Sequence, residues 1–89
     1  MGNKVVRHHY MTINCMDDLK VYYTNHEGEE DTIEVIFGRI KDKTSQKAVY
    51  RIDGTLLSNT GFSLVDLCFF STFVTNNARC ILMDIRGEF

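Results

Sequence analysis

The sequence predicts a small α+β domain in which an antiparallel sheet of about five strands carries one helix, in the order β-β-β-β-α-β. Three observations lead to this prediction. Segments rich in β-branched and aromatic residues recur along residues 4–57, short polar links separate them, and a later apolar segment opens with helix-capping residues.

Length and composition describe one globular domain spanning residues 1–89. Of the 89 residues, 44% are hydrophobic and 25% are charged, which is typical of soluble domains and unlike disordered chains. A chain of this size buries only roughly 60–65% of the surface that its unfolded form exposes. The hydrophobic core is therefore expected to be thin.

Four strands are predicted first, at residues 4–14, 19–24, 32–40 and 48–57. The third is the clearest, because alternation places Ile33, Val35 and Phe37 on one face. Polar links at 25–31 and 41–47 are short enough to join strands two, three and four as an antiparallel meander.

The apolar segment 63–76 has residues that favour a strand but start signals that favour a helix. Ser63 is placed to cap a helix, and Asp66 follows three residues later, as in a capping box. Phe62 and Leu67 occupy the two positions of a hydrophobic staple. These signals predict a helix at about 63–76, packed across the sheet.

Asn76-Asn77 is expected to end this helix, because asparagine tolerates the left-handed conformation of a C-cap. Residues 79–85 are nearly all apolar and are expected to form the last, internal strand. The alternative fold is an all-β small barrel, in which 67–75 and 78–85 form a hairpin.

No motif in the chain points to catalysis, a cofactor or a metal. His8 and His9 are adjacent on a predicted strand, so they point to opposite faces and do not chelate one ion. Cys68 and Cys80 lie in apolar contexts and are expected in the core, and Cys15 precedes two aspartates that oppose thiolate formation. We therefore expect no enzymatic activity, no cofactor and no metal site.

The remaining totals favour a cytoplasmic setting without membrane insertion. The cysteine count is odd, no signal pattern is visible, and the longest nearly uncharged run, 67–78, is too short to span a bilayer. The net charge of −2 argues against a generic nucleic-acid binder, although a local basic patch is compatible with it.

Charge is separated along the chain. Four acids, Glu27, Glu29, Glu30 and Asp31, occupy the link between strands two and three. Five basic residues surround the next hairpin: Arg39, Lys41, Lys43, Lys47 and Arg51. Because consecutive hairpin links lie at opposite ends of a meander, we expect an acidic end and a basic end. Such an arrangement suits oriented docking to a charged partner.

Aromatic pairs supply candidate anchors for a partner. One of Tyr22 and Tyr23 must face away from the core, since neighbours on a strand point to opposite faces. In a helix, Phe69 and Phe73 widen the apolar arc beyond what one sheet face covers.

The sequence therefore predicts a non-catalytic protein-interaction domain, a small accessory, regulatory or inhibitory binder that self-associates as a homodimer. The expected partner-binding residues are Tyr22, Tyr23, Glu27, Glu29, Glu30, Asp31, Phe69 and Phe73. The alternative is a nucleic-acid-binding module using the basic hairpin 39–51, with phosphate contacts from Arg39, Lys41, Lys43, Lys47 and Arg51.

Overall fold

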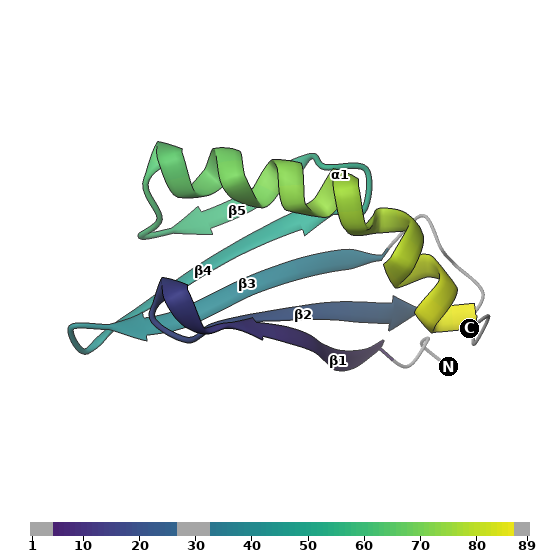
Figure 1. The fold of residues 1–89 in the computed structure, drawn as a ribbon, viewed down its shortest axis with the longest axis horizontal. Coiled ribbons are helices and arrows are strands. Elements are labelled where there is room, and N and C mark those ends of the chain that lie inside the picture. The colour runs from purple at the N-terminus through teal and green to yellow at the C-terminus, as the bar shows by residue number, and fades with distance from the viewer. Residues whose placement is uncertain (1–4, 27–32, 87–89) are drawn as a thin grey trace.

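The described part of the chain folds into an open, five-stranded antiparallel sheet with one α-helix across one face (Figure 1). The computed structural model describes residues 5–26 and 33–86. Its elements are β1 (Val5–Ile13), η1 (Asn14–Met16, a short 3-10 helix), β2 (Leu19–His26), β3 (Glu34–Lys41), β4 (Thr44–Arg51), β5 (Leu56–Thr60) and α1 (Leu64–Arg86).

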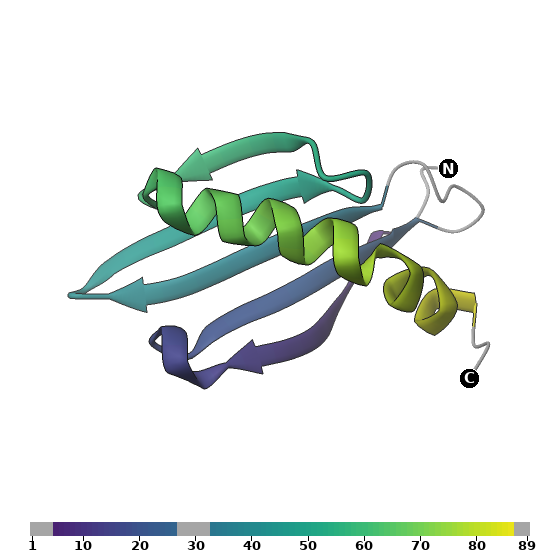
Figure 2. The same ribbon diagram turned by 45° about the horizontal axis from the view of Figure 1, so that its top comes forward.

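The strands lie in the sheet in chain order, β1-β2-β3-β4-β5, and every neighbouring pair is antiparallel. Figure 2 shows α1 running diagonally over the sheet, from the end of β5 toward the β1 side. The predicted α+β class, with an antiparallel sheet and one helix, is confirmed. The barrel alternative is wrong, because the sheet stays open.

The turn between β3 and β4 is tighter than the sequence suggested. Asp42 and Lys43 both have positive φ, 51° and 65°, which is the signature of a two-residue type I′ hairpin turn. β4 consequently begins at Thr44 instead of residue 48. The short turn places Lys41 and Lys47 within strands.

The fourth predicted strand, 48–57, is divided in two by a second turn. The Asp53 carboxylate accepts a hydrogen bond from the Thr55 amide at 2.9 Å, and Gly54 adopts a φ of 97° that glycine tolerates best. The chain therefore reverses after Arg51, and residues 56–60 return alongside β4 as β5.

The predicted start of the helix is confirmed. The Asp66 amide donates to the Ser63 hydroxyl at 3.3 Å, and Phe62 is buried in the core with Leu67 packed against the same cluster. The Asp66 carboxylate does not bind back to the cap, because it pairs with Arg39 on β3 at 3.4 Å.

The predicted end of the helix is wrong. α1 continues through Asn76-Asn77 to Arg86, so residues 79–85 are helical and the order is β-β-β-β-β-α. The Asn77 side chain donates to the Phe73 carbonyl at 2.8 Å and accepts from the Tyr10 hydroxyl at 3.2 Å. These bonds satisfy an asparagine inside the helix. Ile81 is fully buried one turn further on, so the apolar stripe continues past the asparagines.

The core lies between α1 and the face of the sheet that it crosses. Its centre is the stack of Phe37 on Phe70, whose ring centroids are 4.2 Å apart and nearly parallel at 8°. Phe62 meets Phe70 edge-on at 4.8 Å, and Tyr50 meets Phe37 in the same way at 5.7 Å. The other face of the sheet is covered by none of the described elements.

We expect Phe70→Ala to lower the free energy of unfolding by about 3–5 kcal/mol, because it removes a fully buried ring and leaves a cavity. Val65→Ala, at a helix position that is 79% exposed, is the control and is expected to change stability by less than about 0.5 kcal/mol. Urea denaturation followed by circular dichroism measures both. Equal losses would contradict the core described here.

The stability of the domain is also expected to fall at alkaline pH. Burial, followed by the hydrogen bond that its hydroxyl donates to Asp84, raises the pKa of Tyr23 from 10.0 to about 12. The folded state thus favours the neutral phenol. The contribution of Tyr23 to the free energy of unfolding is therefore complete below pH 10.0 and is lost as the pH rises to about 12. Tyr23→Phe is expected to make the decline shallower over that range, as measured by urea titrations at several pH values. An identical decline would contradict this assignment.

Candidate functional site

The candidate site is the sheet face that points away from α1, which we call the open face. Alternation sends every second residue of β2, β3 and β4 to it, and the register aligns these residues in rows. One row joins Lys20, Gly38 and Lys47 across β2, β3 and β4. The next row joins Tyr22 and Ile36 on β2 and β3.

Gly38 creates a hollow at the centre of the open face. A Cβ placed on it would have as its nearest neighbour the Gln46 carbonyl oxygen at 3.9 Å, so the space above the glycine is open. A shallow hollow of about 470 Å³ lies there, and its lining includes Lys20, Tyr22 and Lys47. This volume is within the range of small-ligand sites, roughly 300–1,000 Å³.

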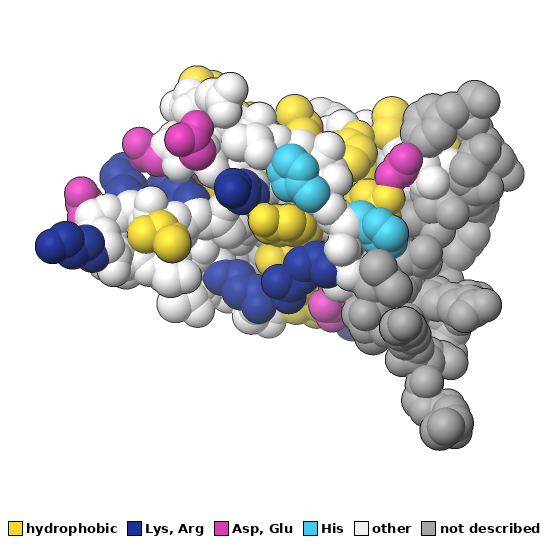
Figure 3. Space-filling model, turned by 90° about the horizontal axis from the view of Figure 1, so that it is seen from below, with side chains coloured by type: hydrophobic (Ala, Val, Ile, Leu, Met, Phe, Trp, Pro, Cys, Tyr) yellow, Lys and Arg dark blue, Asp and Glu magenta, His cyan; other side chains and the backbone are white. Residues whose placement is uncertain are grey.

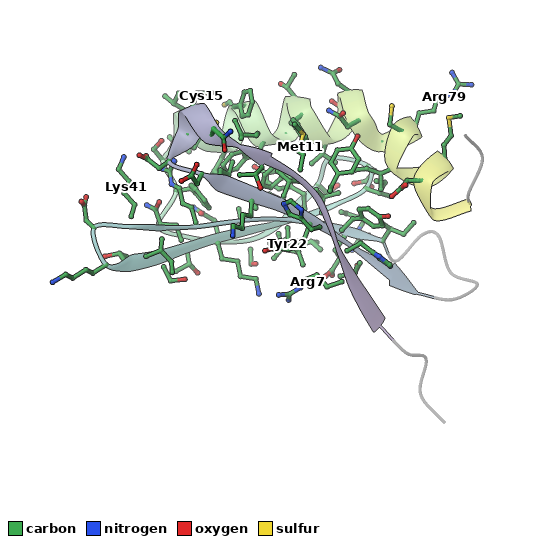
Figure 4. The ribbon with its side chains drawn as sticks, turned by 60° about the horizontal axis from the view of Figure 1, so that its bottom comes forward. Arg7, Met11, Cys15, Tyr22, Lys41 and Arg79 are labelled. Atoms are coloured by element: carbon green, nitrogen blue, oxygen red, sulfur yellow. The ribbon has the colours of Figure 1, made fainter. Side chains whose placement is uncertain are left out.

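Tyr22 is the aromatic residue of the open face. The Arg7 guanidinium lies 5.9 Å from its ring centroid, and the His9 ring meets it edge-on at 5.4 Å. Figure 4 shows Arg7 and Tyr22 on the side of the sheet away from α1. The ring is half-buried, and its cross-strand neighbour Ile36 is 5% exposed, so Tyr22 is packed at its position on the sheet.

The open face is basic although the chain as a whole has a net charge of −2. Arg7, Lys20, Lys47 and Arg51 are all exposed on it. Figure 3, from below, shows Lys and Arg gathered with histidine around hydrophobic side chains. Among the described strand residues, Glu34 is the acid on this face, and Asp17 and Asp18 line the end of the hollow near the β1–β2 turn.

The predicted basic hairpin 39–51 is not one surface. Lys47 and Arg51 lie on the open face, Lys43 lies in the β3–β4 turn, and Arg39 and Lys41 lie on the opposite side of the sheet. Lys41 pairs with Asp17 at 3.4 Å, and Figure 4 shows its side chain on the side of α1.

Arg39 has a structural role instead of a phosphate-binding one. Its side chain is 7% exposed, and its guanidinium carbon lies 5.0 Å from the centre of the Phe62 ring. It connects four parts of the fold through Gln46 (2.6 Å), the Met16 carbonyl (3.2 Å), Asp66 (3.4 Å) and Asp17 (3.7 Å). The planar fork of arginine provides these several directed donors at once.

The predicted partner-binding residues are scattered. Tyr22 faces away from the core as expected of one tyrosine in the pair, whereas Tyr23 is 4% exposed and lies in the core. Phe69 is 44% exposed on α1, and Phe73 is half-buried against Tyr10 and Phe37. Four further predicted residues lie outside the described part of the chain: Glu27, Glu29, Glu30 and Asp31.

The cysteines differ from expectation. Cys68 and Cys80 are exposed, as is Cys15, so the expected burial of the first two is wrong. Cys68 is two residues from the buried Phe70, which places it about 200° around the helix from the core side. Within residues 5–26 and 33–86, no three His, Cys, Asp or Glu side chains are grouped to hold a metal ion. None of the helices in these ranges combines the length and the hydrophobicity that a membrane span requires.

The sequence prediction missed Arg7 and Lys20, which supply half of the exposed cations of the open face. Both alternate with residues of the covered face: Lys20 lies between Leu19 and Val21, which are fully buried. Alternation along β2 therefore indicated that Lys20 faces away from the core. The cations cluster only because four strands are side by side, which no local pattern shows.

The chain was compared with family models, curated proteins and solved structures. No family model matches the chain, and no curated protein or solved structure shows a significant match to it.

We expect Arg39→Ala to destabilise the fold by about 2–4 kcal/mol, because it leaves the partly buried Asp66 without its partner and uncovers Phe62. Arg39→Lys is expected to recover only part of this loss, since lysine lacks the fork. The matched control is Lys47→Gln, at an exposed cation on the adjacent strand, with a change below about 0.5 kcal/mol. Urea denaturation distinguishes the variants, and a neutral Arg39→Ala would contradict the structural role.

Proposed function

We propose that the chain is a non-catalytic binding module that holds single-stranded nucleic acid on its open face. The observation that carries the proposal is the placement of four exposed cations, Arg7, Lys20, Lys47 and Arg51, around Tyr22 and the hollow over Gly38. The chain as a whole has a net charge of −2, so the grouping of these four cations on one face differs from the average charge of the chain.

The cations are placed to follow a phosphate backbone. Lys20 and Lys47 flank Gly38 in one row, and with strands about 4.8 Å apart they stand roughly 10 Å from each other across the hollow. Arg7 and Arg51 extend the positive charge along the strands. A polyanion that binds such a surface releases its condensed counterions, which supplies sequence-independent affinity.

Tyr22 supplies the second element of single-strand recognition. An aromatic ring on an open sheet face offers a platform on which an unpaired base stacks, and such stacking is tolerant of base identity. Arg7 and His9, beside the ring, add a guanidinium and an imidazole of the kind that also stack on bases. A duplex keeps its bases paired and stacked, so it gains little from this platform.

The protein-interaction function that the sequence favoured is compatible with the same surface. An acidic protein segment would meet the same cations, but it would make less use of a supported aromatic ring. For this reason we place nucleic acid first. The regulatory or inhibitory role, the cytoplasmic location and the absence of enzymatic activity stay predictions.

The test is fluorescence anisotropy with a labelled oligothymidylate of about 15 nucleotides, titrated over a range of salt concentrations. With four phosphate contacts, log K is expected to fall with log salt with a slope of about −3. Lys47→Gln is expected to make this slope shallower by about 0.7, and Tyr22→Leu to weaken binding by about 1–3 kcal/mol while leaving the slope unchanged.

The matched control is Lys43→Asn, which removes an exposed cation from the β3–β4 turn and keeps a residue that tolerates positive φ. It is expected to leave binding nearly unchanged. Absence of binding at low salt, or equal losses from Lys43→Asn and Lys47→Gln, would overturn the proposal. Polyglutamate binding as tight as that of the oligonucleotide, and insensitive to Tyr22→Leu, would assign the face to acidic proteins instead.

A further inference from the structure

β5 is an edge strand with little of the usual protection: its pairing with β4 has one register shift, which leaves Leu57 between the pairs Val49–Ser58 and Tyr50–Leu56. It is the last strand of the sheet, all five of its residues are exposed, and it contains no charged residue and no proline. Leu56 and Leu57 are 42% and 41% exposed on it. Soluble proteins usually protect such edges with lysine, proline, bulges or a covering element, because unpaired backbone groups there bind further strands.

The described part of the other edge, β1, differs from β5 in its side chains. It carries Arg7, His8 and His9, whereas β5 carries no charged residue. A register shift interrupts the pairing of both edge strands, between His9 and Met11 on β1 and beside Leu57 on β5. Pairing of β5 with β1 of another molecule would also leave two free edges and grow without limit. The difference between the two edges favours pairing of β5 with itself.

We infer that β5 of a second copy of this chain pairs antiparallel with β5, so that two sheets join into one continuous sheet. The absence of charge in Leu56–Thr60 means that two identical strands meet without like-charge repulsion. The pairing covers the exposed faces of the leucines and closes at two copies, since each molecule offers one such edge.

The start of α1 adds apolar surface beside this edge. Figure 2 shows the first turn of α1 next to the end of β5. Leu64 in that turn is 80% exposed. The strand itself is five residues long, or about 17 Å, so the interface is at the small end of specific interfaces. We therefore expect a dimer that dissociates reversibly on dilution.

The dimer also bears on the proposed function. A two-fold axis perpendicular to the sheet relates antiparallel edge strands, so the two open faces lie side by side on one surface. The basic surface is thereby doubled, and an oligonucleotide long enough to reach both halves gains affinity without new contacts. This consequence alone rests on the proposed function.

The experiment is sedimentation velocity without nucleic acid, from about 1 μM to about 1 mM protein. The mass is expected to rise from 10.3 kDa to twice that value. Leu57→Lys is expected to weaken the dimer at least ~10-fold. The matched control is Met11→Lys, which makes the same kind of change at a residue of similar exposure, 39%, on the other edge, and is expected to leave the dimer intact.

A second measurement reports on the backbone pairing itself. Amide hydrogens in residues 56–60 are expected to exchange more slowly at high protein concentration, while circular dichroism confirms that each variant is folded. A strictly monomeric wild-type chain, a dimer unchanged in Leu57→Lys, or equal losses in both variants would overturn the inference. So would loss of the dimer in Val65→Lys alone, which would place the interface on α1. Because no nucleic acid is present, these outcomes are independent of the oligonucleotide titrations.

Discussion

The stack of Phe70 on Phe37 is the contact on which the rest of this structure depends. Within residues 5–26 and 33–86, α1 is the α-helix that covers the sheet, and the stack fixes it over β3. Once one face is covered, alternation along the strands places the side chains between the core residues on the opposite face. The residues that alternate with the core are left on a face that the described elements do not cover, and there the cations gather around Tyr22.

Arg39 shows how tertiary context changes the meaning of a charge. In the sequence it is one of five basic residues around a hairpin, whereas in the fold it is nearly buried and holds η1, β4 and the start of α1 together. Its partner Asp66 was expected to complete a helix cap, and it neutralises Arg39 instead. A buried guanidinium requires a carboxylate partner of this kind. The interactions that give Arg39 its structural role therefore also leave it unable to act as an exposed cation.

Much of the fold could be predicted because its signals are local. Ile33, Val35 and Phe37 alternate as a half-buried strand, and Ser63 caps the helix as its position suggests. Some errors were local, because the turn at Asp53 and Gly54 that divides the strand predicted at 48–57 rests on neighbouring residues. The error at the end of the helix arose where a distant residue decides. Asn77 is accommodated inside α1 partly by the hydroxyl of Tyr10, 67 positions earlier in the chain, and that bond leaves no trace near the asparagine.

The sequence by itself determined the class of the protein: one small α+β domain, an antiparallel sheet with strands read from period-two alternation, and a helix start marked by its cap. Only the tertiary structure decided where that helix ends, which strands lie at the edges of the sheet, and which charges share a face. The physical reason is the range of the interactions. Capping and alternation act over a few residues. The row of Lys20, Gly38 and Lys47, in contrast, exists only through the pairing register of strands that the chain brings together on folding.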